Sequence, residues 1–316
     1  MGPENLTSVT EFILAGLTSH RKIQILLFVV ILIIYTLTVM GNVGIIMLVW
    51  SDPHLHTPMY FFLKHFAGLE ICYVTTGMPQ MLAHLHAANG IISFSRCVAQ
   101  GYVSTCLGTV ELFLLGIMAY DRYLAICCPL VYAIAMGRSR QWQLASATWA
   151  AGFVSALIYV GSMLPHPYCG PNRINHFYCE LPLVLKLACA DTHTSEAIGL
   201  ALAGVVLASS LAVVLASYTL ILSTVLAMKS TAGRRKAFST CSSHLAVVTL
   251  FYGTVASMYM RPRSSSAPDT DKHIAVFYVV ITPLLNPIIY TLRNKDIHAA
   301  VAKMLRRWRE GCNTEM

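Results

Sequence analysis

The chain has 316 residues, of which 56% are hydrophobic even without glycine and only 11% are charged. Soluble domains carry about 25% charged residues, so this chain has too few to cover its apolar side chains in water. These values exclude a soluble enzyme, a disordered protein and a fibrous repeat, and they predict an integral protein of the lipid bilayer. The net charge of +8 does not indicate nucleic-acid binding, because the basic residues lie in short connections between apolar segments.

Seven apolar segments are long enough to cross a bilayer as helices, which takes about 20 residues each. In chain order they are Ile23–Trp50, Pro58–His86, Cys97–Tyr120, Gln141–Pro165, Ala197–Met228, Ala237–Met260 and Ile274–Leu292. The connections between them are too short for another folded domain. We therefore predict an all-α membrane protein, with a seven-transmembrane helix bundle over residues 23–293 and an N-terminal segment over residues 1–22.

The residues after the last apolar segment have the pattern of an amphipathic helix. Between Lys295 and Arg309, apolar residues recur at helical spacing with basic residues between them. Such a helix is expected to lie along a membrane surface, so we predict that residues 294–316 form a short amphipathic helix at the inner leaflet and a cytoplasmic tail. The alternative is a frayed polar tail.

The distribution of basic residues predicts the orientation of the bundle. Cytoplasmic connections are enriched in Lys and Arg, and with the N-terminus outside the cell more than half of the 22 Lys and Arg residues face the cytoplasm. Asn5, in the sequence Asn5-Leu6-Thr7, is then a glycosylation acceptor on the outer side. We predict a multi-pass plasma-membrane protein with an extracellular N-terminus.

Four cysteines are expected at the outer membrane face, where disulfides form: Cys97, Cys169, Cys179 and Cys189. Their spacing leaves all three pairings open. His176 lies three residues before Cys179, a spacing found in metal sites. Since a cysteine in a disulfide does not also bind metal, we predict no metal site here.

Two acidic residues, Glu70 and Glu111, fall deep inside predicted membrane helices, where a charge is costly. Two nearby carboxylates do not both ionise cheaply unless a cation or a proton lies between them. One interpretation is a sodium or proton site that biases the conformation. The other is a neutral carboxylic acid hydrogen-bonded to Asn42 or Asn286. Beyond a possible sodium ion, the sequence predicts no cofactor.

Five separate sequence blocks, in order along almost the whole chain, carry a family resemblance. They are Gly41-Asn42, Leu55–Leu63 (LHTPMYFFL), Met118–Tyr132 (MAYDRYLAICCPLVY), Lys236–Leu245 (KAFSTCSSHL) and Pro283–Asn294 (PLLNPIIYTLRN). Together they resemble the olfactory receptors, a branch of the rhodopsin-like G-protein-coupled receptors. The loop from Tyr168 through Asp191 is also similar to theirs, which implies the disulfides Cys97–Cys179 and Cys169–Cys189.

The resemblance also implies a switch at the cytoplasmic side. Arg122 would exchange its partner Asp121 for the C-terminus of a G protein, and Tyr218 would meet the inner end of the last helix on activation. The residues implied in coupling and switching are Asp121, Arg122, Tyr123, Tyr218, Asn286, Pro287 and Tyr290. The implied partner is a heterotrimeric G protein of the stimulatory olfactory type, which raises cyclic AMP.

Helical spacing predicts a ligand pocket in the outer half of the bundle. Small or hydroxyl-bearing residues share one face of the third helix, tyrosines face them from the sixth and seventh, and no acid lies among them. The candidate ligand-binding residues are Ser104, Thr105, Gly108, Thr109, Leu202, Ala203, Val206, Tyr252, Val255, Ala256, Tyr259, Tyr278 and Val279. An apolar pocket with a few polar anchors predicts a small neutral volatile ligand, an odorant. The alternative is that the small residues only permit close helix packing.

We therefore expect an odorant receptor. The alternative from a different class is a cation-coupled transporter or channel that uses Glu70 and Glu111 as a relay. Transporters usually contain internal repeats, and we find none in this sequence. An enzyme is not expected, because neither an HExxH motif nor a catalytic-triad pattern is present.

Overall fold

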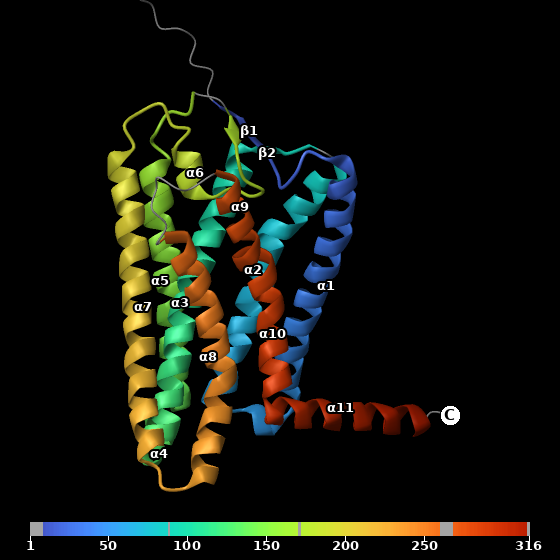
Figure 1. Ribbon diagram of the computed structural model, residues 1–316, viewed down its shortest axis with the longest axis vertical. Helices are drawn as coiled ribbons and strands as arrows, with labels where there is room; N and C mark the ends of the chain where they lie inside the picture. The colour runs from blue at the N-terminus through green and yellow to red at the C-terminus, as the bar shows by residue number, and fades with distance from the viewer. Residues whose placement is uncertain (1–8, 88, 170–171, 260–267, 315–316) are drawn as a thin grey trace, which may run out of the picture.

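The computed structural model describes residues 9–87, 89–169, 172–259 and 268–314, and within these the long helices run alongside one another (Figure 1). The long helices are α1 (Arg21–Ser51), α2 (Pro58–Ala87), α3 (Phe94–Cys127), α5 (Arg138–Met163), α7 (His193–Ala227) and α8 (Thr231–Tyr259). The last segment of the bundle continues through α9 (Pro268–Val276), the π-helix η2 (Phe277–Ile281) and α10 (Thr282–Arg293). Each predicted apolar segment is therefore helical over nearly all of its described residues, and the predicted helix bundle is confirmed.

Among the described residues, five helical segments are long and apolar enough to span a membrane by composition alone. They are Arg21–Ser51, Phe94–Cys127, Arg138–Met163, His193–Ala227 and Lys272–Thr291. In α8 the apolar stretch is shorter, Cys241–Val255, and α2 includes Lys64, Glu70 and several histidines. Buried polar residues lie on both helices, among them Glu70 on α2 and His244 on α8.

Apolar side chains cover the outside of the bundle, as a helix in lipid requires. Leu26 on α1 is 63% exposed and Leu200 on α7 is 65% exposed. The interior is built around α3, which contacts α2, α5, α7 and α8, and most of its buried apolar residues belong to the main hydrophobic cluster. α3 therefore holds the centre of the bundle, where the sequence places the candidate pocket and switch.

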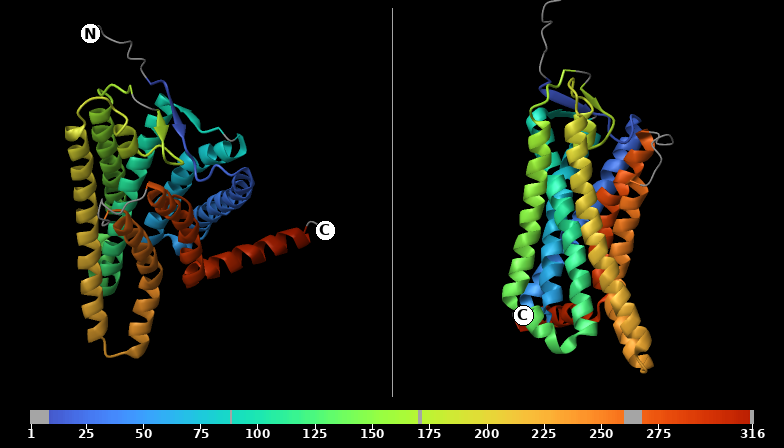
Figure 2. Two further views of the ribbon diagram at one scale, coloured as in Figure 1. Left: turned by 45° about the horizontal axis from the view of Figure 1, so that its top comes forward. Right: turned by 90° about the vertical axis from the view of Figure 1, so that its left-hand side faces the viewer.

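A three-stranded sheet covers one end of the bundle, which we call the capped end (Figures 1 and 2). The central strand β1 (Glu11–Leu14) is antiparallel to β2 (Ile91–Ser93) and parallel to β3 (Arg173–Ile174). In β1, Phe12 and Leu14 are buried, and the Phe12 ring lies 5.7 Å from that of Phe94 and 6.3 Å from that of Tyr168. Part of the predicted polar N-terminal segment is thus a structural strand of the cap.

At the opposite end, which we call the α11 end, the helix α11 (Lys295–Thr314) turns sideways from the long helices and projects beyond α1 (Figure 1). The predicted amphipathic helix is therefore present and extends further than Arg309. Asp52 and Tyr60 hold it: Lys303 Nζ lies 3.3 Å from Asp52 Oδ1, and the Tyr60 hydroxyl donates to Asp296 Oδ2 at 3.0 Å. The remaining short helices are η1 (Pro53–Leu55), α4 (Pro129–Ala135) and α6 (Leu181–Leu185).

The close contact between α3 and α5 depends on Gly152. A Cβ atom at this position would lie 2.5 Å from Val110 Cγ2 and 2.8 Å from the Cys106 carbonyl oxygen. Because the second contact is with backbone, we expect Gly152→Ala to lower the free energy of unfolding by about 1–3 kcal/mol. The measurement is the thermal unfolding midpoint in detergent. Gly161→Ala is the matched control, since no atom lies within 4 Å of its added Cβ; equal midpoints for the two variants would contradict this account.

Candidate functional site

Two disulfides fix the loop between α5 and α7 at the capped end. Cys97, near the start of α3, is bonded to Cys179 in the loop, and Cys169 is bonded to Cys189 within it. These are the pairs that the family resemblance implies. The first disulfide links residues 82 positions apart, so it anchors the loop to the central helix of the bundle.

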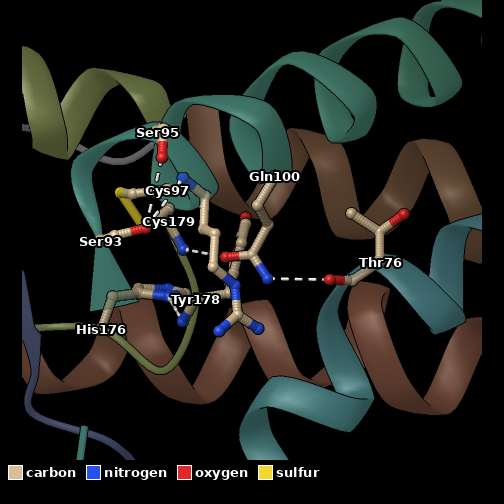
Figure 3. Close-up of a disulfide and its surroundings, with 9 residues drawn as sticks. Thr76, Ser93, Ser95, Cys97, Gln100, His176, Tyr178 and Cys179 are labelled. Atoms are coloured by element: carbon tan, nitrogen blue, oxygen red, sulfur yellow. Dashed lines mark hydrogen bonds between the residues drawn. A yellow bond between two sulfur atoms is a disulfide. The ribbon is translucent and has the colours of Figure 1, made fainter. Parts of the chain in front are cut away.

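Gln100 adds a second attachment beside the first disulfide (Figure 3). Its Oε1 accepts a hydrogen bond of 2.8 Å from the Cys179 backbone nitrogen, and its Nε2 donates to the Thr76 carbonyl oxygen in α2, also at 2.8 Å. Gln100 is buried. A single side chain of α3 therefore links the loop to α2, a role that the sequence pattern did not suggest.

The loop also enters the bundle next to the predicted pocket face of α3. A Cβ atom on Gly101 would overlap the side chain of Leu181, so a larger residue there would displace Leu181. Leu181 begins the short helix α6 and is 2% exposed. The sequence analysis did not place loop residues in the candidate site, because nothing in their spacing shows which side chains point inward.

The candidate ligand residues of α3 do not all share one environment. Ser104, Thr105 and Gly108 are half-buried. Thr109 is buried, and its hydroxyl donates to the Thr105 carbonyl oxygen at 3.0 Å and accepts from the Ser155 hydroxyl of α5 at 3.3 Å. The Thr109 hydroxyl is thus engaged between α3 and α5 in this structure.

The candidates on α7 divide in the same way. Val206 is buried, and Leu202 packs against the apolar cluster of the capped end. Ala203 is exposed on the outer surface of the bundle, because α7 turns this face away from its neighbours. Of the candidate residues on this helix, the structure places Val206 and Leu202 inside and Ala203 outside.

On α8 and the last segment of the bundle, two of the predicted tyrosines are hydrogen-bonded to other elements. The Tyr252 hydroxyl donates to Ser210 Oγ of α7 at 2.8 Å, and Val255 is half-buried. Tyr278 is half-buried and hydrogen-bonded to the loop residue Tyr178, and Val279 is buried. The side chains of Ala256 and Tyr259 lie outside the described part of the structure, as does Asn5.

A cavity of about 420 Å³ lies elsewhere, between α3 and α5 near the capped end. It opens toward the outside of the bundle, where Ala99 and Leu164 are exposed. Its lining residues are Phe94, Ser95, Val98, Ala99, Tyr102, Val103, Val160 and Leu164. This set shares no residue with the candidate ligand residues, so this cavity is distinct from the predicted pocket.

The two deep acids lie near the middle of the bundle. Asn286 Nδ2 donates to Glu70 Oε1, whereas Asn42 donates to the Thr38 carbonyl oxygen at 3.0 Å. Glu111 is buried and lies within electrostatic range of Glu70. Among the described residues, Glu70 Oε2 and Asn286 Oδ1 are buried acceptors without a hydrogen-bond partner. A proton on Glu70 or a bound cation would satisfy them.

A buried ion pair lies at the α11 end of α3. Arg122 Nη2 is 3.3 Å from Asp121 Oδ2, and both side chains are at most 7% exposed. The Tyr132 hydroxyl of α4 donates to Asp121 Oδ1 at 2.8 Å. Tyr123, the third residue of the motif, is half-buried against the neighbouring apolar cluster of α7 and α8. The pair thus joins α3 to α4, and Tyr132 is a partner that the sequence did not assign.

Residues of α7, α8 and α10 surround this pair. The Tyr218 hydroxyl lies 2.8 Å from Nδ1 of His244, with their rings stacked at 5.9 Å. Tyr290 is fully buried, its ring lies 6.1 Å from that of Phe66, and among the described residues its hydroxyl has no hydrogen-bond partner. Pro287 packs beside Gly41 of α1. Tyr218 is thus bound to α8 and not to Tyr290 in this structure, an arrangement that must change if the two tyrosines meet.

His176 gives the cap a dependence on pH. Burial, and then the nearby Lys272, lower the pKa of His176 to about 4, while Glu180 Oε2 lies 3.9 Å from its Nε2. In the unfolded chain the His176 side chain takes up a proton near pH 6.5, whereas in the folded protein it stays neutral down to about pH 4. The folded state is therefore fully stable above pH 6.5 and loses stability as the pH falls toward 4. We expect the free energy of unfolding to fall by about 3 kcal/mol over this range.

The measurement is the thermal unfolding midpoint of the purified protein between pH 7 and 4. His176→Gln should flatten the profile, and His193→Gln, at an exposed position, should leave it unchanged. A wild-type profile that His176→Gln does not alter would show that another group is responsible.

Similarity to known proteins identifies the family of this chain. A family model described as olfactory receptor matches residues 31–307. Human olfactory receptor 2Y1 is 47% identical over 98% of this chain and 99% of its own length, and human olfactory receptor 2G3 is 46% identical over 96% and 99%. Mouse olfactory receptor 8U9 is 46% identical over 96% of this chain and 97% of its own length.

Among solved structures, squid rhodopsin superposes with a TM-score of 0.72, covering 93% of this chain and 88% of its own. At 15% sequence identity, this likeness shows the fold alone, a bundle of seven helices. The family model and the relatives show that the chain belongs to the olfactory receptor family of G-protein-coupled receptors.

Proposed function

We propose that this odorant receptor binds small neutral volatile ligands in the capped half of the bundle, between α3, α7, α8 and η2. We further propose that it activates a stimulatory, olfactory-type heterotrimeric G protein through the α11 end, which raises cyclic AMP. In this proposal the N-terminus and the capped end are extracellular. The observation that carries it is the buried Asp121–Arg122 pair, a charged switch at the end of α3 opposite the disulfide-bonded cap.

The neutral character of the ligand is supported by the composition of the candidate pocket. The candidate ligand residues include no charged side chain, so a protonated amine would have no counter-ion among them. Burial of a few hundred Å² of apolar surface at about 25 cal/mol per Å² gives modest affinity once the costs of binding are subtracted. We expect micromolar binding and broad selectivity.

The proposed signal path runs along α3 to the Asp121–Arg122 pair. Ligand contacts at α8 and η2 would bias the position of α8, which the Tyr218–His244 hydrogen bond holds against α7. Outward movement of α8 would expose Arg122 to the G protein. Glu70 and Glu111 would hold a proton or a sodium ion that stabilises the resting arrangement, since two buried acceptors at Glu70 and Asn286 lack partners among the described residues.

The test is cyclic AMP accumulation in cells that co-express the receptor with an olfactory-type stimulatory G protein, screened with neutral odorants and with amines of matched size. The expected result is an increase for a subset of neutral odorants, absent without the G protein. An N-terminal epitope that is labelled on intact cells supports the orientation. No response to any odorant at normal surface level would contradict the proposal, and ligand-gated current without the G protein would favour a channel.

The helix α4 is expected to contact the G protein directly. Leu130 is 95% exposed and Ile134 is 84% exposed, and exposed apolar side chains at the edge of a membrane protein indicate an interaction surface. We expect Leu130→Asp to reduce the maximal cyclic AMP response at least about fivefold, because a charged side chain disrupts a desolvated contact. Odorant binding should be unchanged.

The measurement is the dose–response curve at equal surface level. Arg140→Asp is the control, since it places an acid at an exposed position of the same end of the bundle. An equal loss in both variants would assign the effect to charge rather than to a contact by Leu130.

A further inference from the structure

We propose that Tyr178, in the loop between α5 and α7, is a positioning residue of the odorant pocket, and that its hydrogen bond to Tyr278 determines which neutral odorants fit. The inference rests on the proposed pocket, to which Tyr278 and Val279 belong. It adds a residue that no helical pattern points to, because Tyr178 lies in a loop.

The backbone on both sides of Tyr178 is held rigidly. Cys179 is joined to α3 by its disulfide and by the hydrogen bond from its nitrogen to Gln100 (Figure 3). On the other side, the His176 carbonyl oxygen accepts a hydrogen bond of 3.1 Å from the Gly16 nitrogen in the N-terminal segment. Tyr178 therefore projects from a backbone fixed to α3, α2 and the N-terminal segment, and its side chain has a defined place.

The Tyr178 side chain bridges from this loop to η2. Its hydroxyl is hydrogen-bonded to that of Tyr278, and the two rings meet edge to face at 6.5 Å. Tyr178 is 6% exposed and packs against Phe177 at 5.3 Å. Phenylalanine would fill the same space, so the hydroxyl group matters mainly for the hydrogen bond to Tyr278, since a buried tyrosine hydroxyl needs a partner.

The partner segment departs from regular α-helix. Phe277–Ile281 is a π-helix, a rare conformation that occurs frequently at functional sites. Within it, Tyr278 and the buried Val279 are candidate ligand contacts, and Val279 lies in the same apolar cluster as Tyr178. The hydrogen bond from Tyr178 in the rigid loop to Tyr278 in this segment therefore fixes the distance between α3 and η2 across the pocket.

The experiment compares Tyr178→Phe, Tyr278→Phe and the double variant by cyclic AMP dose–response curves, for a homologous series of neutral odorants that differ in chain length. Loss of one hydrogen bond predicts shifts of roughly 3- to 10-fold in half-maximal concentration. The shifts should differ along the series, because the pocket width changes. The double variant should match the single variants, because each removes the same bond.

Tyr168→Phe is the matched control. Its hydroxyl donates to the Met163 carbonyl oxygen at 3.3 Å, so it is another loop tyrosine of the cap whose bond does not reach η2. Shifts that are equal along the series, additive in the double variant or reproduced by Tyr168→Phe would overturn the proposal. So would a fall in surface level with unchanged half-maximal concentrations.

A second measurement does not depend on any odorant. Hydrogen exchange of the purified, unliganded receptor should become faster in residues 277–281 for Tyr178→Phe and remain unchanged there for Tyr168→Phe. Unchanged exchange in this segment overturns the role of Tyr178 even if no odorant is found. A wild-type receptor that is silent to all odorants but exchanges as expected contradicts only the proposed function.

Discussion

Arg122→Ala is expected to reduce the maximal odorant-evoked activation of the G protein at least tenfold while odorant binding is retained. Arg122 is buried and lies 3.3 Å from Asp121, far along α3 from the candidate ligand residues. In the proposed mechanism Arg122 engages the G protein when the α11 end opens, and an alanine would not, so the coupling between the two ends would be lost. Typical coupling energies correspond to factors of about 5 to 150, and we expect the maximal response to fall by at least tenfold within that range.

The measurement is nucleotide exchange on the G protein, at matched receptor amounts and over a range of odorant concentrations. Arg140→Ala, at an exposed position of the same end, is the control and should signal normally. Removal of Arg122 leaves the buried Asp121 with the Tyr132 hydrogen bond alone, which lowers stability, so the two variants are compared at equal surface level. An intact response in Arg122→Ala would remove this residue from the switch.

The helices could be predicted from the sequence because in a bilayer each one must satisfy its own backbone and present an apolar surface. This requirement leaves a long apolar run for each segment, such as Ile23–Trp50, which lies within α1. The strands of the cap leave no such signal. β1 has only four residues, Glu11–Leu14, and its partners lie far away in the chain, so its pairing depends on tertiary contacts. The helix α4 is seven residues long, too short for periodicity to indicate it.

The sequence predicted some residues of the candidate site and missed others, because it describes each helix separately. Spacing indicates which residues share a helix face, but it does not give the rotation of the helix relative to its neighbours. Ala203 fits the spacing on α7 and is nevertheless exposed, and the Thr109 hydroxyl bonds within α3 and to α5. Gln100 and Tyr178 act through contacts across the fold, which no local pattern in the sequence describes.

The two disulfides are expected to differ in their contribution to stability. Cys97–Cys179 closes a sequence separation of 82 residues and Cys169–Cys189 one of 20. Loss of loop-closure entropy gives upper values of about 4.5 and about 3.3 kcal/mol, respectively. Both are upper values because helices that stay in the membrane already restrict the unfolded chain. The first disulfide also holds Cys179 beside Gln100, so its removal releases the loop from α2 as well as from α3.

We therefore expect Cys97→Ala to lower the surface level and the thermal unfolding midpoint more than Cys169→Ala does. A double variant, Cys97→Ala with Cys179→Ala, separates loss of the bond from the effect of an unpaired thiol. Flow cytometry of unpermeabilised cells measures the surface level, and unfolding in detergent with and without reductant measures the midpoint. A larger loss in Cys169→Ala would show that stability of the cap depends on the internal shape of the loop rather than on its attachment to α3.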